Sequence, residues 1–556
     1  MRITKPKCAI FKELLVIITI AIAVLLRILN LGSRELWYDE VLSLLFSTGQ
    51  KVAYHTPEDS PVVLGEYTSL LRIPAELAGR DVITTVRELL RGLLGGEPHP
   101  PLFFLSQHLW LRFFGNSDMA MRSLSALLSV GAIGSAYGLG RVLLGHRGGL
   151  FLTALLGINP FYLFHSLNVR MYGPLVLWTT LSAWALLHLV NHRDNQAVKS
   201  RHTQMLWNSL LIGSVAAGLL TFYLFAYWVV TLAALVLYLD RQRWWQYGRS
   251  LGTGVLLIIP WVLWGTLKQL HNADLKRFGA SKEVGAVGLR HLEDVAQTLG
   301  THLLLGDWVT SLTRTSTLIA GFVVIVLLLA CTFSLWSQGE HRALGVALLM
   351  GIFPLLLALG VDIATGNFTL FFGWGRTTIF ILPGCLLLLA LWVERAPWRW
   401  RELVAVGLLL LYLSICIGDF SLRHRWVFHP IADLIAREPA TPTLIAMNSK
   451  AWGHVLRLAY YIPPTASVML LAQEPANLAS SLAKVLLDDS QYPRILWLDS
   501  ANTVWSRLQT ETEIEMEKRR IQQVLSAQFQ LTLTQQLSGT MDLDQFTIKL
   551  YTRSRA

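Results

Sequence analysis

The fold is decided by a long apolar run, LLVIITIAIAVLLRIL at residues 14–29, and by the heptapeptide that follows it, RELWYDE at residues 34–40. Several basic residues precede the run, and no small-residue cleavage site follows it. This pattern predicts a retained membrane anchor whose N-terminus lies on the cytoplasmic side. The heptapeptide is therefore expected where the chain leaves the membrane on the outer side.

The composition predicts a polytopic membrane protein. The 556 residues are 53% hydrophobic and only 15% charged, whereas about a quarter of the residues in a soluble protein are charged. Twenty tryptophans fit aromatic rings at bilayer interfaces. The net charge of +11 resides mostly in short loops between apolar runs, so it indicates topology and no nucleic-acid partner is expected.

About eleven membrane spans are expected from the apolar runs and from the basic turns that alternate with them. The predicted spans cover residues 14–29, 122–144, 148–164 and about 173–192, a hairpin at 206–239, and then 251–267, 318–335, 344–361, a span beginning at Arg376 and a last one ending near Asp419. This alternation places two large loops, residues 30–120 and 268–316, on the outer side.

The composition changes near residue 423, which divides the chain into a membrane domain, residues 1–422, and a C-terminal domain, residues 423–556. The C-terminal part alternates apolar strand patterns with helical ones, which predicts a small α/β domain on the outer face. Its expected strands are residues 443–447, 466–471, 494–498 and 546–551, with a charged helix at 510–528. The role of this domain is left open.

Adjacent carboxylates stand out in the heptapeptide. Asp39 and Glu40 follow Trp37 and Tyr38, and neighbouring carboxylates can divide labour so that one stays ionised as a base. A dipeptide of this kind is more often a solvated turn. Its position just outside the first span favours a catalytic interpretation.

Four further residues are predicted on the same outer face. His99 is fixed by the prolines on both sides, since proline restricts its own backbone and that of its neighbour. Arg170 and Arg376 lie where spans meet the surface and suit bidentate contacts with phosphate, and Tyr172 offers a hydroxyl group. Taken singly, each has an ordinary role at an interface, such as a snorkelling arginine or a belt tyrosine. Their convergence on one face favours a binding site.

Three motifs resemble those of a known family. LWYDE at residues 36–40, HPPL at 99–102 and RMY at 170–172 are similar to motifs of the C-type integral-membrane glycosyltransferases. They resemble most the bacterial relatives of the dolichyl-phosphate-mannose–protein mannosyltransferases and the aminoarabinose transferases that modify lipid A.

The resemblance implies a C-type glycosyltransferase fold with a polyprenyl-phosphate sugar as donor, and a hexosyl or pentosyl group transferred to a lipid, glycan or protein of the cell envelope. It implies that Asp39 is the catalytic base, that Glu40 assists it, and that His99 and Arg170 line the donor pocket. Arg376 corresponds to a basic residue that begins a late span. The implied location is the bacterial plasma membrane, with the active site and the C-terminal domain on the periplasmic side.

Two other functions remain open at this point. A transporter or flippase for lipid-linked sugars would also have many spans, but it should carry charged or broken helices at the middle of the membrane. A non-catalytic scaffold of an envelope-polysaccharide complex would leave Asp39 and His99 unexplained. The residues show carboxylates but no complete set of metal ligands, so dependence on a divalent metal is undecided.

Overall fold

The structure, a computed structural model, describes the chain except for a few segments, and it divides into two compact units. The residues outside the description are 1–5, 30, 74–79, 192–200, 273–286, 396–400, 424–425, 489–491, 503–509, 540–541 and 554–556. Unit 1 comprises residues 1–31, 93–106 and 121–422. Unit 2 comprises residues 32–92, 107–120 and 423–556.

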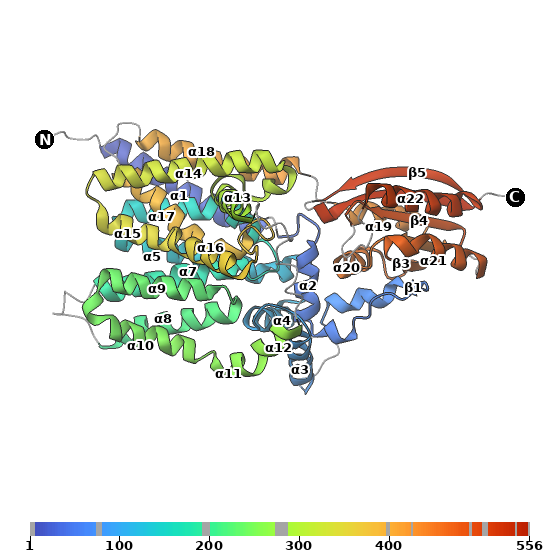
Figure 1. Cartoon of the computed structure of the whole chain (residues 1–556), viewed down its shortest axis with the longest axis horizontal. Coiled ribbons are helices and arrows are strands. Elements are labelled where there is room, and N and C mark those ends of the chain that lie inside the picture. The colour runs from blue at the N-terminus through green and yellow to red at the C-terminus, as the bar shows by residue number, and fades with distance from the viewer. Residues whose placement is uncertain are drawn as a thin grey trace. The chain divides into compact units, whose positions relative to one another are not determined.

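Unit 1 is a bundle of apolar helices (Figure 1). Its helices are α1 (Pro6–Leu29), α5 (Asp118–Ile158), α6 (Pro160–Ser166), α7 (Tyr172–Asn191), α8 (Arg201–Thr221), α9 (Phe225–Leu239), α10 (Trp244–Leu256), α11 (Ile259–Trp261), α12 (Leu267–Asn272), α13 (Val287–Gly300), α14 (Arg314–Ser337), α15 (His341–Gly351), α16 (Phe353–Thr365), α17 (Leu382–Arg395) and α18 (Arg401–Leu422). Helix α4 (Leu102–Phe114) gives its first residues to unit 1 and the rest to unit 2.

Eight helical segments in the described part of the chain are long and apolar enough to cross a membrane. Helix α5 counts as one of them, although Gly145 leaves helical geometry with a φ of 80° at the point where a basic turn is predicted. Helix α9 is apolar but shorter than the others. The predicted total of eleven spans therefore stays a prediction. The predicted cytoplasmic turn at 193–201 falls mostly on residues outside the description.

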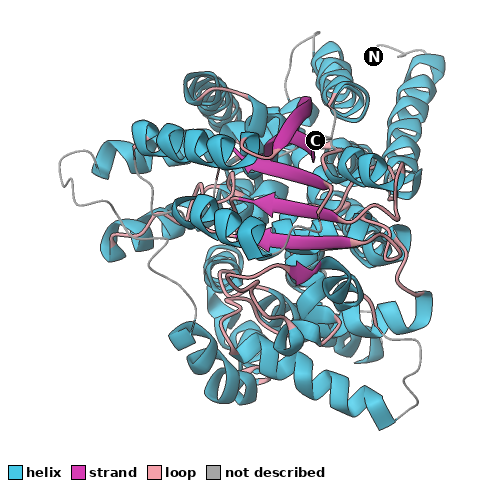
Figure 2. Ribbon diagram, turned by 90° about the vertical axis from the view of Figure 1, so that its right-hand side faces the viewer, coloured by secondary structure: helices cyan, strands magenta, loops and turns pink. Residues whose placement is uncertain are grey.

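Unit 2 is built around one mixed β-sheet (Figure 2). Its strands are β1 (Val62–Val63), β2 (Thr443–Met447), β3 (Val468–Ala472), β4 (Arg494–Ser500), β5 (Phe529–Ser538) and β6 (Gln545–Arg553), in the spatial order β1-β3-β2-β4-β6-β5. Strands β3, β2 and β4 are parallel, whereas β1, β6 and β5 pair antiparallel with their neighbours. The small C-terminal α/β region expected from the sequence is confirmed, and β1 and β5 are additional strands.

Helices cover both faces of this sheet. Helices α21 (Pro475–Asp488) and α22 (Glu511–Ser526) pack on one face, where Leu482, Leu525 and Trp497 belong to the same buried cluster. Helices α19 (Phe428–Ala436) and α20 (Trp452–Tyr461) contact Phe546 of β6 through aromatic rings. Tyr551 of the same strand belongs to the buried cluster under α21 and α22. Side chains five positions apart on a strand point to opposite faces of the sheet, so α19 and α20 lie on the face opposite to α21 and α22.

Most of the segment predicted as the first outer loop, residues 32–92 and 107–120, belongs to the same unit as the C-terminal region. Its helix α2 (Tyr38–Ser47), most of α3 (Arg80–Leu94) and strand β1 all lie in unit 2. Val62 and Val63 of β1 pair with Leu470 and Met469 of β3, so the loop extends the C-terminal sheet by one strand. The two units therefore do not follow the single predicted domain boundary at residue 423. Strand β1 can join the C-terminal sheet because the edge of a sheet offers unpaired backbone groups to a strand from any part of the chain.

Candidate functional site

Asp39 lies in the first turn of helix α2 in unit 2. The helix begins at Tyr38, and both Asp39 and Glu40 are in its first turn, where the helix dipole favours negative charge. The Glu40 carboxylate accepts a hydrogen bond from the backbone N–H of Trp37 at 2.8 Å, and the Glu40 side chain is fully buried. Glu40 therefore fixes the start of the helix, while the neighbouring Asp39 is half-buried.

Tyr38 is the aromatic neighbour of Asp39. Burial, and then the negative charge of Asp39, raise the pKa of the Tyr38 hydroxyl to about 12. The phenol therefore stays protonated at neutral pH, and it adds no charge beside the Asp39 carboxylate.

Two arginines of unit 1 flank one tyrosine ring. The Cζ atom of Arg170 lies 5.8 Å from the centre of the Tyr172 ring, and the Cζ atom of Arg376 lies 5.6 Å from it. Arg170, Tyr172 and Arg376 are all buried, with exposed fractions of 5%, 2% and 7%. Cation–π attraction holds guanidinium groups over aromatic faces at such distances. The structure thus brings Arg376 together with Arg170 and Tyr172, two residues of one motif that lie far from it in the sequence.

The loop before Arg376 has an unusual backbone. Gly373, Trp374 and Gly375 have φ values of 55°, 59° and 80°, a region that is costly for a bulky residue such as Trp374. A Cβ atom on Gly373 would lie 2.3 Å from the Nε atom of Arg376. The absence of a side chain at Gly373 therefore lets the Arg376 guanidinium fold back against the loop.

The buried carboxylate of Asp362 holds the other end of this loop. It accepts hydrogen bonds from the backbone N–H of Thr369 at 2.7 Å and of Leu370 at 3.1 Å, and from the Thr369 hydroxyl at 2.7 Å. Thr377 in turn donates to the carbonyl of Thr369 at 2.6 Å. These bonds fix the segment that carries Arg376.

His99 joins the same set of residues through Phe222, which lies between α8 and α9. The His99 ring stacks on Phe222 with centroids 5.6 Å apart, and Phe222 makes an edge contact with Tyr172 at 6.1 Å. The Glu97 carboxylate bonds to the Nδ1 atom of His99. The side chain of Gln269 donates to the His99 carbonyl at 2.8 Å. His99, Arg170, Tyr172 and Arg376 therefore form one connected group in unit 1, which we call the Tyr172 cluster.

Sequence reasoning assigned no role to Phe222 or Glu97. Phe222 lies at the tip of a predicted hairpin on the outer side, and Glu97 is two residues before His99. Only their positions in the sequence could have indicated these two residues, because neither a phenylalanine nor a glutamate by itself indicates a binding site.

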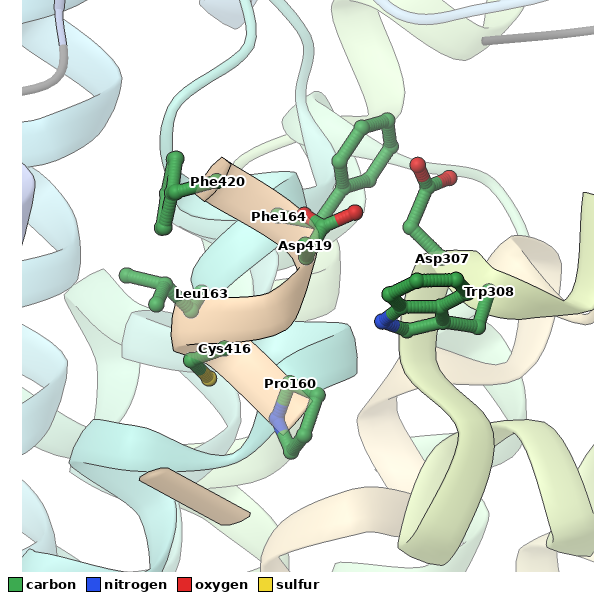
Figure 3. A pocket seen from close by; sticks show the side chains of 8 residues that line it. All are labelled: Pro160, Leu163, Phe164, Asp307, Trp308, Cys416, Asp419 and Phe420. Carbon is green, nitrogen blue, oxygen red and sulfur yellow. The ribbon is translucent and has the colours of Figure 1, made fainter. Parts of the chain in front are cut away.

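A small pocket of unit 1 lies along helix α6 (Figure 3). The pocket is lined by Pro160, Leu163, Phe164, Asp307, Trp308, Cys416, Asp419 and Phe420. The carboxylates of Asp307 and Asp419 lie toward one end of it (Figure 3). The described residues contain no group of three or more His, Cys, Asp or Glu side chains that could hold a metal ion, so two carboxylates here do not define a metal site.

Comparison with known structures identifies the class of fold. The chain resembles the crystal structure of ArnT from Cupriavidus metallidurans in the apo state, with a TM-score of 0.53, 14% identity, and coverage of 96% of this chain and 97% of that one. It also matches the oligosaccharyltransferase AglB from Archaeoglobus fulgidus in complex with an inhibitory peptide and a dolichol-phosphate, with a TM-score of 0.48, 11% identity, and coverage of 98% and 75%. The chain has an ArnT-like fold.

The sequence itself carries the family signal. Residues 98–264 match the family model described as dolichyl-phosphate-mannose-protein mannosyltransferase, a segment that includes His99, Arg170 and Tyr172. No curated protein sequence matches the chain. The chain is an integral membrane protein that resembles this family over residues 98–264 and ArnT in its fold, so the resemblance predicted from the motifs is confirmed.

Proposed function

We propose that this protein transfers a sugar from a polyprenyl-phosphate-linked donor to a cell-envelope acceptor on the outer face of a bacterial plasma membrane. The acceptor is a lipid, a glycan or a protein, and the transferred group is a hexose or a pentose. The observation that carries the proposal is the Tyr172 cluster. The description of the matching family, which names a dolichyl-phosphate mannose, supports the donor class.

The Tyr172 cluster supports a phosphate-binding role. Arg170 and Arg376 approach one aromatic ring from separate elements of unit 1, and guanidinium groups bind phosphate oxygens through paired hydrogen bonds. The strained turn at Trp374 is a further sign of function, since such strain gathers at ligand-binding loops. His99, held by Glu97 and Phe222, would contact the sugar of the donor.

The reaction is a single displacement at the anomeric carbon. Asp39, as general base, takes the proton of an acceptor hydroxyl while that oxygen forms a bond to the anomeric carbon. The bond between the anomeric carbon and the phosphate oxygen breaks, and the configuration inverts. The departing polyprenyl phosphate gathers negative charge, which Arg170 and Arg376 stabilise. Glu40 assists by fixing the helical turn that carries Asp39.

The test is transfer by purified protein in liposomes. Undecaprenyl-phosphate mannose and undecaprenyl-phosphate aminoarabinose serve as donors, and mass spectrometry of envelope lipids, glycans and glycoproteins with and without the protein identifies the acceptor. Asp39→Asn keeps the side-chain volume but removes the base, so transfer should fall at least about 100-fold. Glu40→Gln should lower the rate of transfer less than Asp39→Asn does.

Asp59→Asn is the matched control. Asp59 lies on the same outer loop, its side chain is 83% exposed, and it pairs with Lys450 at 3.1 Å. This variant should transfer sugar at the normal rate. If Asp39→Asn also did so, the base would lie elsewhere. A non-catalytic scaffold predicts that Asp39→Asn is silent and that loss of residues 423–556 is severe.

A further inference from the structure

The segment around Asp39 is attached to the C-terminal part of unit 2 by several buried contacts. The Glu35 carboxylate accepts hydrogen bonds from the backbone N–H groups of Val427 at 2.8 Å, Phe428 at 2.8 Å and His429 at 2.6 Å. These donors are at the start of helix α19, where backbone N–H groups lack partners within the helix. Glu35 thus joins the outer loop to the beginning of the C-terminal region.

A second bond follows one residue later. The backbone N–H of Leu36 donates to the hydroxyl of Tyr461 at 2.6 Å, at the end of helix α20. The position of the chain just before helix α2 is therefore set by two helices of the C-terminal region.

Tyr38 makes the closest approach. Its ring meets the ring of His454 edge-on at 5.4 Å, and the Cζ atom of Arg457 lies 5.7 Å from its centre. Gly453, in the first turn of α20, leaves room for this ring, because a Cβ atom there would lie 2.5 Å from the Cδ2 atom of Tyr38. Tyr38 in the first turn of α2 therefore packs so closely against Gly453 of α20 that no methyl group fits between them.

The residues beneath Tyr38 are themselves held in place. Arg457 donates to the Gly453 carbonyl at 3.0 Å and to the Asp544 carboxylate at 2.5 Å. His454 bonds to the Ser449 hydroxyl at 2.9 Å and to the Leu543 carbonyl at 3.0 Å. A satisfied buried network of this kind is rigid. It gives α20 one orientation toward Tyr38.

We propose that the C-terminal region positions the catalytic base, with Gly453 as the positioning residue that sets Tyr38 and thereby Asp39. This inference rests on the proposed function, because it takes Asp39 as the base. It assigns the C-terminal region a part in catalysis besides any binding of acceptor. A misplacement of about 1 Å at a reacting group can cost about 100-fold in rate.

The test is Gly453→Ala in the full-length protein, with undecaprenyl-phosphate mannose as donor. The added methyl group should push the Tyr38 ring, lowering kcat about 10-fold or more while KM for the donor changes less than about 2-fold. In an Asp39→Asn background the same change should cost nothing further, because there is no base left to misplace. Tyr461→Phe, which removes the acceptor of the Leu36 N–H, should lower kcat in the same sense if Gly453→Ala does not fold.

A second measurement needs no donor. The rate at which an impermeant maleimide labels Asp39→Cys should change when Gly453→Ala is added. Gly65→Ala is the control, since a Cβ atom there would meet nothing closer than Val63 Cγ1 at 3.9 Å. An unchanged labelling rate, or an unchanged kcat in Gly453→Ala beside an inactive Asp39→Asn, would overturn the positioning role alone. Full transfer by Asp39→Asn would instead overturn the proposed base.

Discussion

The guanidinium of Arg376 lies 5.6 Å from the ring centre of Tyr172, although the two residues are far apart in the sequence. Arg170 lies at a similar distance from the same ring. Tyr172 therefore orients two cations that belong to different parts of the helical bundle. In the proposed function, both guanidinium groups contact the phosphate of the donor.

Replacement of these arginines by lysine tests the phosphate role. Arg170→Lys should lower transfer about 10-fold to 100-fold, because a point charge cannot reproduce the paired bonds of the guanidinium plane. The measurement is transfer together with binding of undecaprenyl phosphate. Arg314→Lys is the control, since Arg314 is 67% exposed and pairs with Glu293. Normal transfer and donor affinity in both Arg170→Ala and Arg376→Ala would make the two arginines interfacial anchors.

The loop before Arg376 gives a sharper probe. Gly373→Ala places a methyl group against the Arg376 guanidinium, so its loss of transfer should match that of Arg376→Ala, and the double variant should be no worse. Gly366→Ala is the matched control. Gly366 also has a positive φ, 69°, but a Cβ atom there would meet nothing within 4 Å. Equal losses in the two glycine variants would show backbone strain rather than displacement of Arg376.

Membrane orientation is tested by cysteine labelling from outside the cell. Asp59→Cys and Ala501→Cys, both at exposed positions of unit 2, should react with an impermeant maleimide. Lys199→Cys and Gln338→Cys, in predicted cytoplasmic turns, should react only after the cells are permeabilised. The reverse pattern would move the proposed site to the cytoplasm.

His454 predicts how stability depends on pH. Burial, and then the positive charge of Arg457, lower the pKa of His454 to about 3, below its usual value of about 6.5. The folded protein keeps this imidazole neutral, whereas the unfolded chain binds a proton below about pH 6.5. The contribution of His454 to the free energy of unfolding is complete above that pH. It falls as the pH drops toward 3, by at most about 1.4 kcal/mol per pH unit.

The check is the thermal unfolding midpoint of the intact protein at pH 7 and pH 4.5. His454→Gln should lose less stability between these values than the unaltered protein, because it carries no titrating ring. The same fall in both proteins would assign the acid sensitivity to other groups.

The sequence by itself determined the parts that depend on local pattern. Apolar runs of helical length indicated the membrane helices, and alternation in the last third indicated β2, β3, β4 and β6. The motifs at His99, Arg170 and Tyr172 identified a class of protein, and the basic turns predicted that these residues share one face. Each of these signals lies within a short window of the chain.

Tertiary structure decided which segments, far apart in the sequence, contact one another. Strand β1, near the N-terminus, extends the C-terminal sheet, and Glu35 caps helix α19 of the C-terminal region. Phe222 joins His99 to Tyr172, and Gly373 leaves room for Arg376. None of these residue types indicates its partner by periodicity, because a backbone donor, a ring face or a missing methyl group becomes specific only when packing brings the other half against it.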